Sequence, residues 1–390
     1  MLARSKRISA KAIDALSAAA RDAAPVSGWT HNFYRYPARF SPQFAAAAIR
    51  HFSKPDDVIL DPYMGGGTSV VEALVAGRQV VGNDLNSLAI FVTKVKSTPL
   101  KKSERVVIRE WASEEVPNFQ YRQSMEPLAE YIDNDKVKNL SLARARFLKK
   151  IIAAALASIS KLPTTNTRRF AKCVVLRAGQ WALDGRSCHT SVAEFRTKLL
   201  GMTDEMLAAI NLFADRLKSS DCRAWLLNVD AAELDKSRTL RENPVNLVVT
   251  SPPYPGVHML YHRWQVDGRR ETPAPYWISG CNDGEGASFY NFGDRRQSAS
   301  DNYFQKSLAT LQAIRAVMRE NALMIQMIAF NNPDEQLPRY LQNMDQAGFR
   351  EVRDKYQRRI RRDVPSRRWH ANLKGKLPSA REVVLIHQAS

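Results

Sequence analysis

Cysteine is scarce in this sequence, and the residues that occur are widely spaced. The four cysteines are Cys173, Cys188, Cys222 and Cys281, and no two of them form a Cys-x-x-Cys pair. This spacing argues against a disulfide framework and against a structural zinc site. Cys188 precedes His189, but no second pair of ligands lies near in the sequence, so no metal is expected.

Long apolar runs are also missing. No stretch is long enough to span a bilayer, and the N-terminus has no apolar segment of the kind that directs secretion. Residues 1–24 are rich in alanine, serine and basic residues, as transit peptides are, but Asp14 and Asp22 argue against that interpretation. A loose N-terminal helix is simpler. We therefore expect a cytoplasmic protein without a membrane partner.

Acidic residues are few compared with basic ones. The 39 acidic residues face 58 lysines and arginines, which gives a formal net charge of +19. Basic side chains neutralise phosphates and supply sequence-independent affinity for nucleic acid. Charge alone does not distinguish DNA from RNA, from an anionic membrane or from a solvated basic face. A polyanionic partner is the first hypothesis.

The length and the hydrophobic content indicate a globular enzyme-sized chain. Its 390 residues are 44% hydrophobic and 25% charged, which is ordinary for a folded protein with a sizeable core. We expect one large catalytic domain that carries an inserted module.

The first strongly patterned stretch predicts a βαβ unit. Residues 58–61 form a buried strand, three glycines follow at 65–67, and residues 68–77 have a helical pattern. Residues 79–82 form a second apolar strand, which ends at Asn83 and Asp84. The glycine loop then lies at the carboxyl end of the first strand.

Residues 98–220 have a different composition. Glycine is rare, basic residues are frequent, and apolar residues recur at helical spacing. The clearest stripe, with gaps of three or four, consists of Val192, Phe195, Leu199, Met202, Met206, Ile210, Phe213 and Leu217. Such a stripe is usually core. We interpret the segment as a helical insertion, and its basic residues, Arg168 and Arg169 among them, as a candidate DNA contact.

Strands alternating with helices resume after the insertion. The predicted strands are 224–229, 245–250, 322–330 and 383–387, and a helix is expected at 302–319. A parallel sheet with an antiparallel edge is the natural assembly. Before the last strand lies a basic cluster that we expect to contact DNA phosphates, namely Arg358, Arg359, Arg361, Arg362, Arg367 and Arg368.

The glycine loop and Asp84 suggest a site for a ribose-containing cofactor. Glycines let the backbone approach a ligand closely, and an acidic residue at the end of the next strand can hold a ribose diol. Asp84 stands about twenty residues after the loop, where that carboxylate is expected. The alternative is a tight turn followed by a helix cap.

A second signal is the sequence Asn-Leu-Val-Val-Thr-Ser-Pro-Pro-Tyr at 246–254. A buried strand ends here at two prolines, which fix the backbone and leave carbonyl groups without competing donors. The lone pair of an exocyclic base amine is delocalised, so acceptors such as the Ser251 hydroxyl and the Pro252 carbonyl would help it attack. Tyr254 would stack on a base swung out of the duplex.

These motifs resemble those of the amino-group-specific DNA methyltransferases, which modify cytosine N4 or adenine N6. Residues 61–68 are similar to the first cofactor motif, with Gly66 where serine is more usual. Asn83 and Asp84 resemble the ribose motif, and Asp230 occupies the position that contacts adenine. Residues 251–254 are similar to the catalytic tetrad, whose Ser-first form is commoner among cytosine N4 enzymes. Residues 31–42 resemble the N-terminal cofactor motif.

The resemblance covers roughly residues 28–98 and 222–388 and implies specific roles. It implies a Rossmann-like α/β S-adenosylmethionine-dependent methyltransferase fold with a mainly helical insertion, divided at 1–98, 99–220 and 221–390. The implied catalytic residues are Ser251, Pro252, Pro253 and Tyr254. The implied cofactor residues are His31, Tyr36, Pro37, Ala38, Arg39, Phe40, Asp61, Pro62, Tyr63, Gly65, Gly66, Gly67, Thr68, Asp84, Asn86 and Asp230.

Several functions remain open at this stage. The leading hypothesis is methylation of double-stranded DNA at cytosine N4, with S-adenosylmethionine as cofactor and a restriction endonuclease as a candidate counterpart. Adenine N6 and an RNA base amine are alternative targets. A DNA-binding protein that kept the fold and lost turnover is the non-enzyme alternative. Target recognition is placed either in the helical insertion or in residues 255–301, which follow the tetrad.

Overall fold

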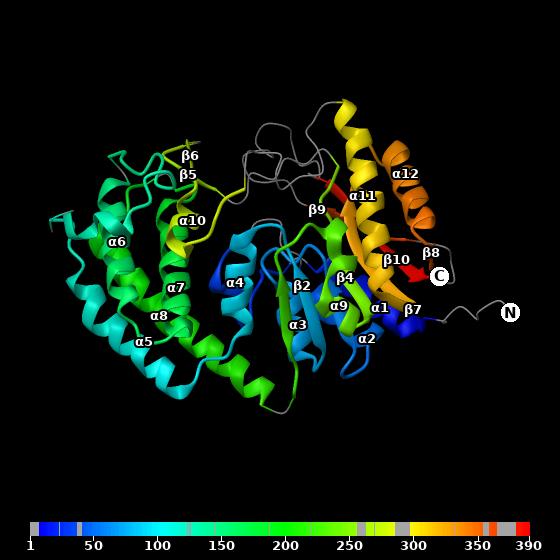
Figure 1. The fold of residues 1–390 in the computed structure, drawn as a ribbon, viewed down its shortest axis with the longest axis horizontal. Helices are drawn as coiled ribbons and strands as arrows, with labels where there is room; N and C mark the ends of the chain where they lie inside the picture. The colour runs from blue at the N-terminus through cyan, green and yellow to red at the C-terminus, as the bar shows by residue number, and fades with distance from the viewer. Residues whose placement is uncertain are drawn as a thin grey trace.

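The computed structural model describes residues 8–22, 24–36, 41–122, 124, 126–143, 145–186, 188–218, 220–255, 263–268, 270–284, 297–330, 332–353, 359–364 and 380–390. Within them a central eight-stranded sheet has the order β3-β2-β1-β4-β7-β10-β8, and β9 pairs with β10 (Figure 1). Its strands are β1 (Val58–Asp61), β2 (Gln79–Asn83), β3 (Ala224–Leu227), β4 (Val245–Thr250), β7 (Met318–Ala329), β8 (Phe349–Glu351), β9 (Ile360–Val364) and β10 (Ala380–Ala389).

Most of the sheet is parallel. Neighbours from β3 through β7 run in the same direction, whereas β10 is antiparallel to β7, β8 and β9. The chain leaves β1 toward β2 and β3, then returns to place β4 on the other side of β1. The strand order therefore reverses between β1 and β4, and ligands bind at the carboxyl ends of strands flanking such a point.

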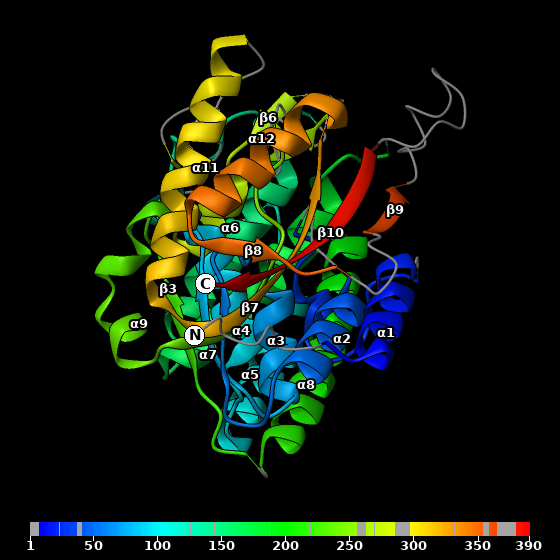
Figure 2. The ribbon, with the colours of Figure 1, turned by 90° about the vertical axis from the view of Figure 1, so that its right-hand side faces the viewer.

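Helices cover both faces of the sheet because its central strands are apolar on both sides. Ile59 packs into a core with α1 (Ala10–Arg21), α2 (Pro42–Phe52), α3 (Thr68–Val75) and α4 (Ser87–Ser97). Leu60, the next residue, packs into a second core with η4 (Ala231–Lys236), α9 (Arg238–Glu242), α11 (Gln297–Val317) and α12 (Pro333–Gln346). Figure 2 shows β7 and β10 between α11 and α12 on one side and α1 and α2 on the other.

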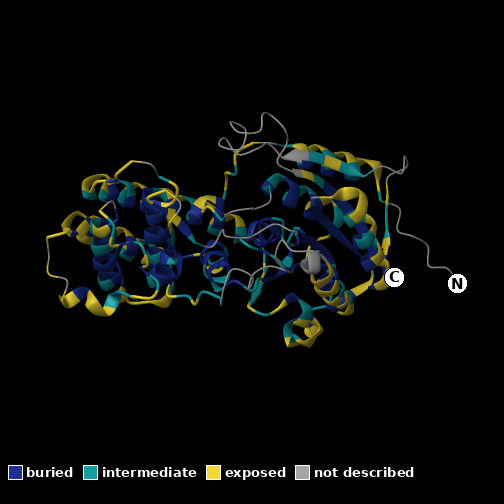
Figure 3. Cartoon of the chain, turned by 90° about the horizontal axis from the view of Figure 1, so that it is seen from above, coloured by how far each residue is buried: buried dark blue, intermediate teal, exposed yellow. Residues whose placement is uncertain are grey.

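The segment between α4 and β3 is mainly helical. It contains α5 (Lys102–Glu115), η2 (Val116–Asn118), η3 (Glu126–Tyr131), α6 (Arg146–Ser160), α7 (Thr165–Leu183) and α8 (Val192–Leu217). Ser191 and Glu194 form a capping box at the start of α8. The stripe predicted on α8 is core, since Phe195, Leu199 and Ile210 are fully buried. This core continues into the α3 and α4 face of the sheet. Figure 3 shows buried residues, in dark blue, in the helical part and in the sheet part alike.

The chain returns to the insertion after β4. The hairpin β5 (Trp264–Val266) and β6 (Arg270–Thr272) leads into α10 (Ala274–Ser279), and both pack on α7. A Cβ atom on Gly179 of α7 would lie 2.9 Å from the Trp264 ring, so glycine allows this approach. The Trp264 indole donates a hydrogen bond to the Tyr34 hydroxyl at 3.0 Å. Residues 264–279 were not predicted as structured elements.

The predicted Rossmann-like α/β fold with a mainly helical insertion is confirmed. The largest error in the strand limits is at β7, which starts at Met318 rather than at residue 322, because residues 319–321 are exposed and polar. Strands β8 and β9 were not predicted. No helix among the described residues is long and apolar enough to cross a membrane.

Candidate active site

Asp61 joins three elements where the strand order reverses. Its Oδ1 accepts hydrogen bonds from the Thr250 hydroxyl of β4 at 2.8 Å and from the Tyr63 amide at 3.1 Å, and its Oδ2 accepts one from Ser69 of α3. The side chain is nearly fully buried, and burial raises its pKa to about 6. Because internal donors engage both oxygens, we interpret Asp61 as a positioning residue between β1 and β4.

The glycine loop is shaped by close packing of the chain's own side chains. Gly65 and Gly67 have φ values of +48° and +73°, which favour glycine. A Cβ atom on Gly66 would lie 2.7 Å from the Cβ of Tyr36, and one on Gly67 would overlap Thr93. The glycines therefore admit Tyr36 against the loop, so Tyr36 forms a wall of the site.

Buried polar side chains support the loop from behind. Lys96 of α4 donates to the Gly66 carbonyl at 2.6 Å, and Thr30 donates to the Lys96 carbonyl at 2.9 Å. His31 shares a hydrogen bond of 2.8 Å with Glu72 of α3. These side chains are almost fully buried, so His31 is placed beneath the predicted ligand site rather than in it. Sequence reasoning missed Lys96, because the nearby Lys94 in the same apolar stretch is exposed and no local pattern distinguishes the two.

Asp84 lies at the end of β2 and fixes the loop. Its Oδ2 accepts the Gly65 amide and its Oδ1 accepts the Asn86 amide, both at 2.8 Å. Burial raises the pKa of Asp84 to about 6, and the two amide donors oppose that shift. Asn86 donates to the Tyr36 hydroxyl at 3.3 Å and accepts from Tyr276 of α10 at 3.0 Å. Three predicted cofactor residues, Tyr36, Asp84 and Asn86, therefore form one cluster.

Asp230 follows β3 at the same edge of the sheet. It is exposed, and its Oδ1 accepts the Ala232 amide at 2.9 Å. The neighbouring Asn228 donates to the Asp84 carbonyl at 2.8 Å, which links the ends of β2 and β3. The fold thus places the predicted ribose and adenine carboxylates on adjacent strands.

The remaining predicted cofactor residues are placed differently. Tyr63 is packed against the core on the α11 side of the sheet, and burial raises its pKa well above the usual value. Thr68 is buried at the start of α3, and Pro62 is buried beside Asp61. Pro37, Ala38, Arg39 and Phe40 lie outside the described residues.

The predicted tetrad leaves β4 next to the Asp61 junction. Ser251 donates to the Tyr254 hydroxyl at 3.3 Å, and Tyr254 donates to Glu382 of β10 at 2.8 Å. Tyr303 of α11 donates to the Pro253 carbonyl at 2.9 Å. Burial and the negative Glu382 raise the pKa of Tyr254 well above its usual value, so this hydroxyl stays neutral.

Strand β9, which carries Arg361 and Arg362 of the predicted basic cluster, is linked to the tetrad by a polar contact. Arg362 stands opposite Glu382 in the β9 and β10 register, and its Nε lies 3.3 Å from the Glu382 carboxylate. Arg362, Glu382 and Tyr254 therefore form a chain of polar contacts. Sequence reasoning missed Glu382, because 128 residues separate it from Tyr254 and no local pattern distinguishes it.

Three of the six arginines predicted as a phosphate-binding cluster, Arg359, Arg361 and Arg362, lie in the described residues. Arg359 binds Glu351 with two hydrogen bonds, at 2.6 and 2.9 Å. Burial raises the pKa of Glu351, but this pairing and Arg353 lower it to about 2. Arg359 and Arg362 are thus engaged by carboxylates, whereas Arg361 is exposed. Arg358, Arg367 and Arg368 lie outside the described residues.

Comparison with known proteins links the first half of this site to a family. The N6/N4 methyltransferase family, described as DNA methylase, matches residues 19–93. The chain is 41% identical over 78 residues to "Type II methyltransferase M.MvaI" of Kocuria varians, which is 19% of this chain and 17% of that protein. It is 29% identical over 66 residues to "Type II methyltransferase M.MjaII" of Methanocaldococcus jannaschii, which is 17% of this chain and 12% of that protein.

The overall structure has weaker relatives. TrmN from Thermus thermophilus aligns with a TM-score of 0.32 and 13% identity, covering 90% of this chain and 49% of that one. The rRNA methyltransferase aviRa from Streptomyces viridochromogenes aligns with a TM-score of 0.34 and 10% identity, covering 91% and 89%. These scores are too low to support a functional conclusion. The family match contains Asp61, the glycine loop and Asp84, but ends before the tetrad.

Proposed function

We propose that this chain, whose residues 19–93 match the N6/N4 DNA methylase family, transfers a methyl group to an exocyclic amine of a DNA base. The observation that carries the proposal is the Thr250–Asp61 hydrogen bond of 2.8 Å. It holds the start of the tetrad against the strand that leads into the glycine loop. A base presented to Ser251 would therefore face the ligand of that loop.

S-adenosylmethionine is the cofactor that the family implies, and the residues at this edge fit it. Asp84 keeps lone pairs beyond its two amide contacts and would accept hydrogen bonds from the ribose hydroxyls. The exposed Asp230 on the next strand would reach the adenine. Tyr36, packed on the loop, would line the methionine end. When bound, the cofactor supplies an electrophilic methyl group.

The tetrad residues supply what an exocyclic amine needs. The amine is a weak nucleophile, and acceptors that bind its protons favour the tetrahedral nitrogen of the transition state. The Ser251 hydroxyl and the Pro252 carbonyl are these acceptors in our proposal. The Tyr254 ring stacks on the extruded base. Its hydroxyl is neutral and donates to Glu382, so Tyr254 positions the base and does not remove a proton.

Cytosine N4 in double-stranded DNA is the proposed target, because Ser251 begins the tetrad. Adenine N6 is the second candidate within the same chemistry. Because the two relatives are named type II methyltransferases, we extend the proposal to a restriction endonuclease counterpart that the methylation protects against.

Nucleoside mass spectrometry tests this function. The full chain is expressed in bacteria that lack DNA methyltransferases, and their DNA and tRNA are digested to nucleosides. We expect N4-methylcytosine in DNA, and far less of it when Ser251→Ala is expressed at the same level. If N6-methyladenine is found instead, the target is adenine. If methylation is found in tRNA alone, DNA is not the substrate. If the purified protein transfers a methyl group to none of these substrates, a DNA-binding protein without turnover is the alternative that remains.

Two neighbouring arginines should behave differently in DNA binding. Arg361→Gln removes an exposed cation, so it should flatten the slope of log affinity against log salt by about one unit. Arg362→Gln removes the partner of Glu382 and should lower the turnover number while leaving that slope unchanged. Fluorescence anisotropy at several salt concentrations and a methyl-transfer assay measure the two effects. If both variants changed the salt slope and the turnover number equally, Arg361 and Arg362 would not have the separate roles that we propose.

A further inference from the structure

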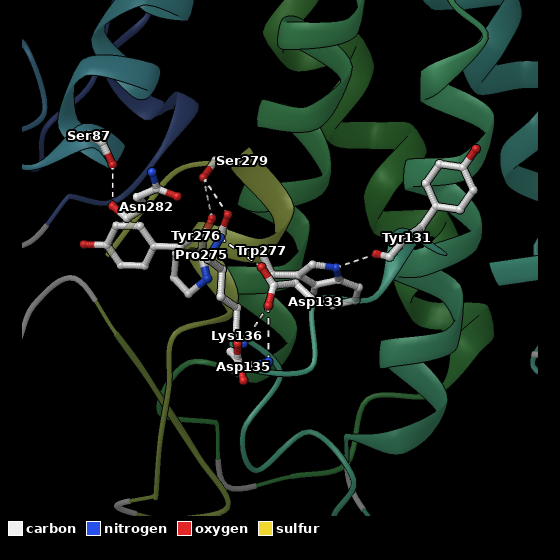
Figure 4. A network of polar contacts seen from close by, with 10 residues as sticks. All are labelled: Ser87, Tyr131, Asp133, Asp135, Lys136, Pro275, Tyr276, Trp277, Ser279 and Asn282. Atoms are coloured by element: carbon white, nitrogen blue, oxygen red, sulfur yellow. Dashed lines mark hydrogen bonds and ion pairs between the residues drawn. The ribbon is translucent and has the colours of Figure 1, made fainter. Parts of the chain in front are cut away.

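A separate cavity lies between the helical insertion and the cofactor half of the sheet. It has a volume of about 650 Å³ and is lined by residues of η3, α6 and α7 of the insertion, by Phe91 of α4 and by Trp277 of α10. Within the described part of the chain, none of the proposed catalytic or cofactor residues lines it. Figure 4 shows how its wall is held, with the Trp277 indole donating to the Tyr131 carbonyl at 2.6 Å.

The cavity carries three cations from two successive turns of α7. Arg168, Arg169 and Lys172 all line it and are partly buried. Arg168 donates to the Leu162 carbonyl at 2.6 Å. Arg169 and Lys172 make no hydrogen bond or ion pair with any residue in the described ranges. Burial lowers the pKa of the Lys172 ammonium. A partly buried cation without a counter-ion favours an anionic ligand.

The carboxylates at this cavity do not neutralise these cations. Asp133 accepts an ion pair from Lys136 at 2.9 Å and a hydrogen bond from the Asp135 amide at 3.2 Å (Figure 4). Lys136 lowers the pKa of Asp133 and compensates its negative charge. Glu130 is the other acidic side chain in the lining, and it is exposed. The cavity is therefore net positive.

We propose that this cavity binds a phosphate of the DNA strand, with Arg169 and Lys172 as the ligands of that phosphate. The proposal rests on the proposed function, because it takes DNA as the substrate. Cations placed beside aromatic walls are the usual combination for a nucleic-acid strand. Phe91, Tyr131 and Trp277 supply these walls, and the net charge of +19 favours a polyanion.

Helix α10 connects this cavity with the cofactor loop. Trp277 lines the cavity, and the preceding residue, Tyr276, donates to Asn86 at 3.0 Å. The main-chain amide of Asn86 in turn donates to Oδ1 of Asp84 at 2.8 Å. A phosphate held by α7 would therefore anchor the strand beside the helix that contacts the cofactor site, and would help to orient the target base.

A charge-matched pair of double variants tests the proposal. Arg169→Gln with Lys172→Gln removes both ligands, and Lys102→Gln with Arg109→Gln removes the same charge from exposed positions on α5. In anisotropy titrations, the cavity variant should bind duplex DNA about 10- to 100-fold more weakly at low salt and should flatten the salt slope by about one unit, because the two side chains contact one phosphate. The control should change the slope much less, and both should keep S-adenosylmethionine affinity.

The outcomes separate this proposal from the proposed function. If the wild type binds and methylates DNA while the cavity variant matches the control at every salt concentration, the cavity proposal alone is wrong. If the wild type neither binds nor methylates DNA, both proposals are wrong. Thermal melting of each variant establishes that it is folded.

Chemical labelling of Lys172 identifies the source of the phosphate. The wild type is acetylated with acetic anhydride, and the modification of Lys172 is compared with that of exposed Lys102 by mass spectrometry. We expect a short duplex to slow the labelling of Lys172 several-fold at low salt. Protection by inorganic phosphate or deoxycytidine monophosphate but not by duplex would overturn the strand assignment. Equal labelling under all conditions would overturn the site itself.

Discussion

Ser251→Ala should lower the turnover number for methyl transfer by about 10²- to 10³-fold, the range found when one preorganised transition-state hydrogen bond is removed. The hydroxyl lies at the end of β4 and makes one weak internal contact, with Tyr254 at 3.3 Å. Its loss should therefore not disturb the fold. Cofactor affinity, measured by calorimetry, should stay unchanged, because Ser251 acts on the base.

Tyr254→Ala should reduce DNA methylation by about 10- to 100-fold, because stacking contributes about 1–3 kcal/mol per base. Tyr254→Phe keeps the ring and removes the hydroxyl with its hydrogen bonds to Glu382 and Ser251, so it should retain most of the stacking. Tyr121→Ala, at an exposed tyrosine of the insertion, serves as the matched control. Near-normal transfer in both Ser251→Ala and Tyr254→Ala would reject the tetrad as the catalytic site.

Asp84→Asn should weaken S-adenosylmethionine binding by about 10- to 100-fold, since a hydrogen bond to a charged group contributes about 1.5–3 kcal/mol. The substitution keeps the shape of the side chain and removes its charge and one of its two acceptor oxygens, of which Oδ2 accepts the Gly65 amide and Oδ1 the Asn86 amide. Asp235→Asn, at an exposed position of η4, is the control. Unchanged affinity in a folded Asp84→Asn protein would mean that the ribose does not bind here.

The same residue should set the pH dependence of cofactor binding. Burial raises the pKa of Asp84 to about 6, so the carboxylate gains a proton as the pH falls through that value. The ribose hydroxyls need the ionised form as acceptor, so affinity should be constant well above pH 6 and should decline as the pH falls through that value. Calorimetry across this range should find the decline in the wild type and not in Asp84→Asn. A decline that persists in the variant would point to Asp61, whose pKa burial also raises to about 6.

The sequence predicted the elements near the glycine loop well because their signals are local. The apolar run before Asp61, the glycines and Asp84 lie within one βαβ unit. The hydrophobic period, the turn residues and the spacing from the glycines to Asp84 therefore predict the same local structure. The apolar stripe of α8 was equally informative, and its members are buried except for Val192 and Leu217 at the two ends, which are partly buried. The contact partners of these residues were not predictable, and Tyr36, rather than open space, faces Gly66.

The Arg-rich segment illustrates the opposite case. Its composition suggested phosphate contacts, but the antiparallel pairing of β9 with β10 places Arg362 beside Glu382. Arg359 is likewise held by Glu351. Strand pairing over such sequence distances depends on which edges the whole sheet leaves available, and local charge density carries no information about that.

The amino-acid sequence by itself determined the α/β alternation, the helical insertion, the glycine loop with Asp84 at its expected distance, and the Ser-Pro-Pro-Tyr turn, because hydrophobic period and turn chemistry act over short ranges. Only the tertiary structure decided that β4 returns beside β1, which brings Thr250 to Asp61. It also decided that Glu382 accepts a hydrogen bond from the Tyr254 hydroxyl, and that residues of α7 and α10 line a basic cavity. These contacts join residues far apart in the chain, and burial of both sheet faces, rather than any local pattern, selects them.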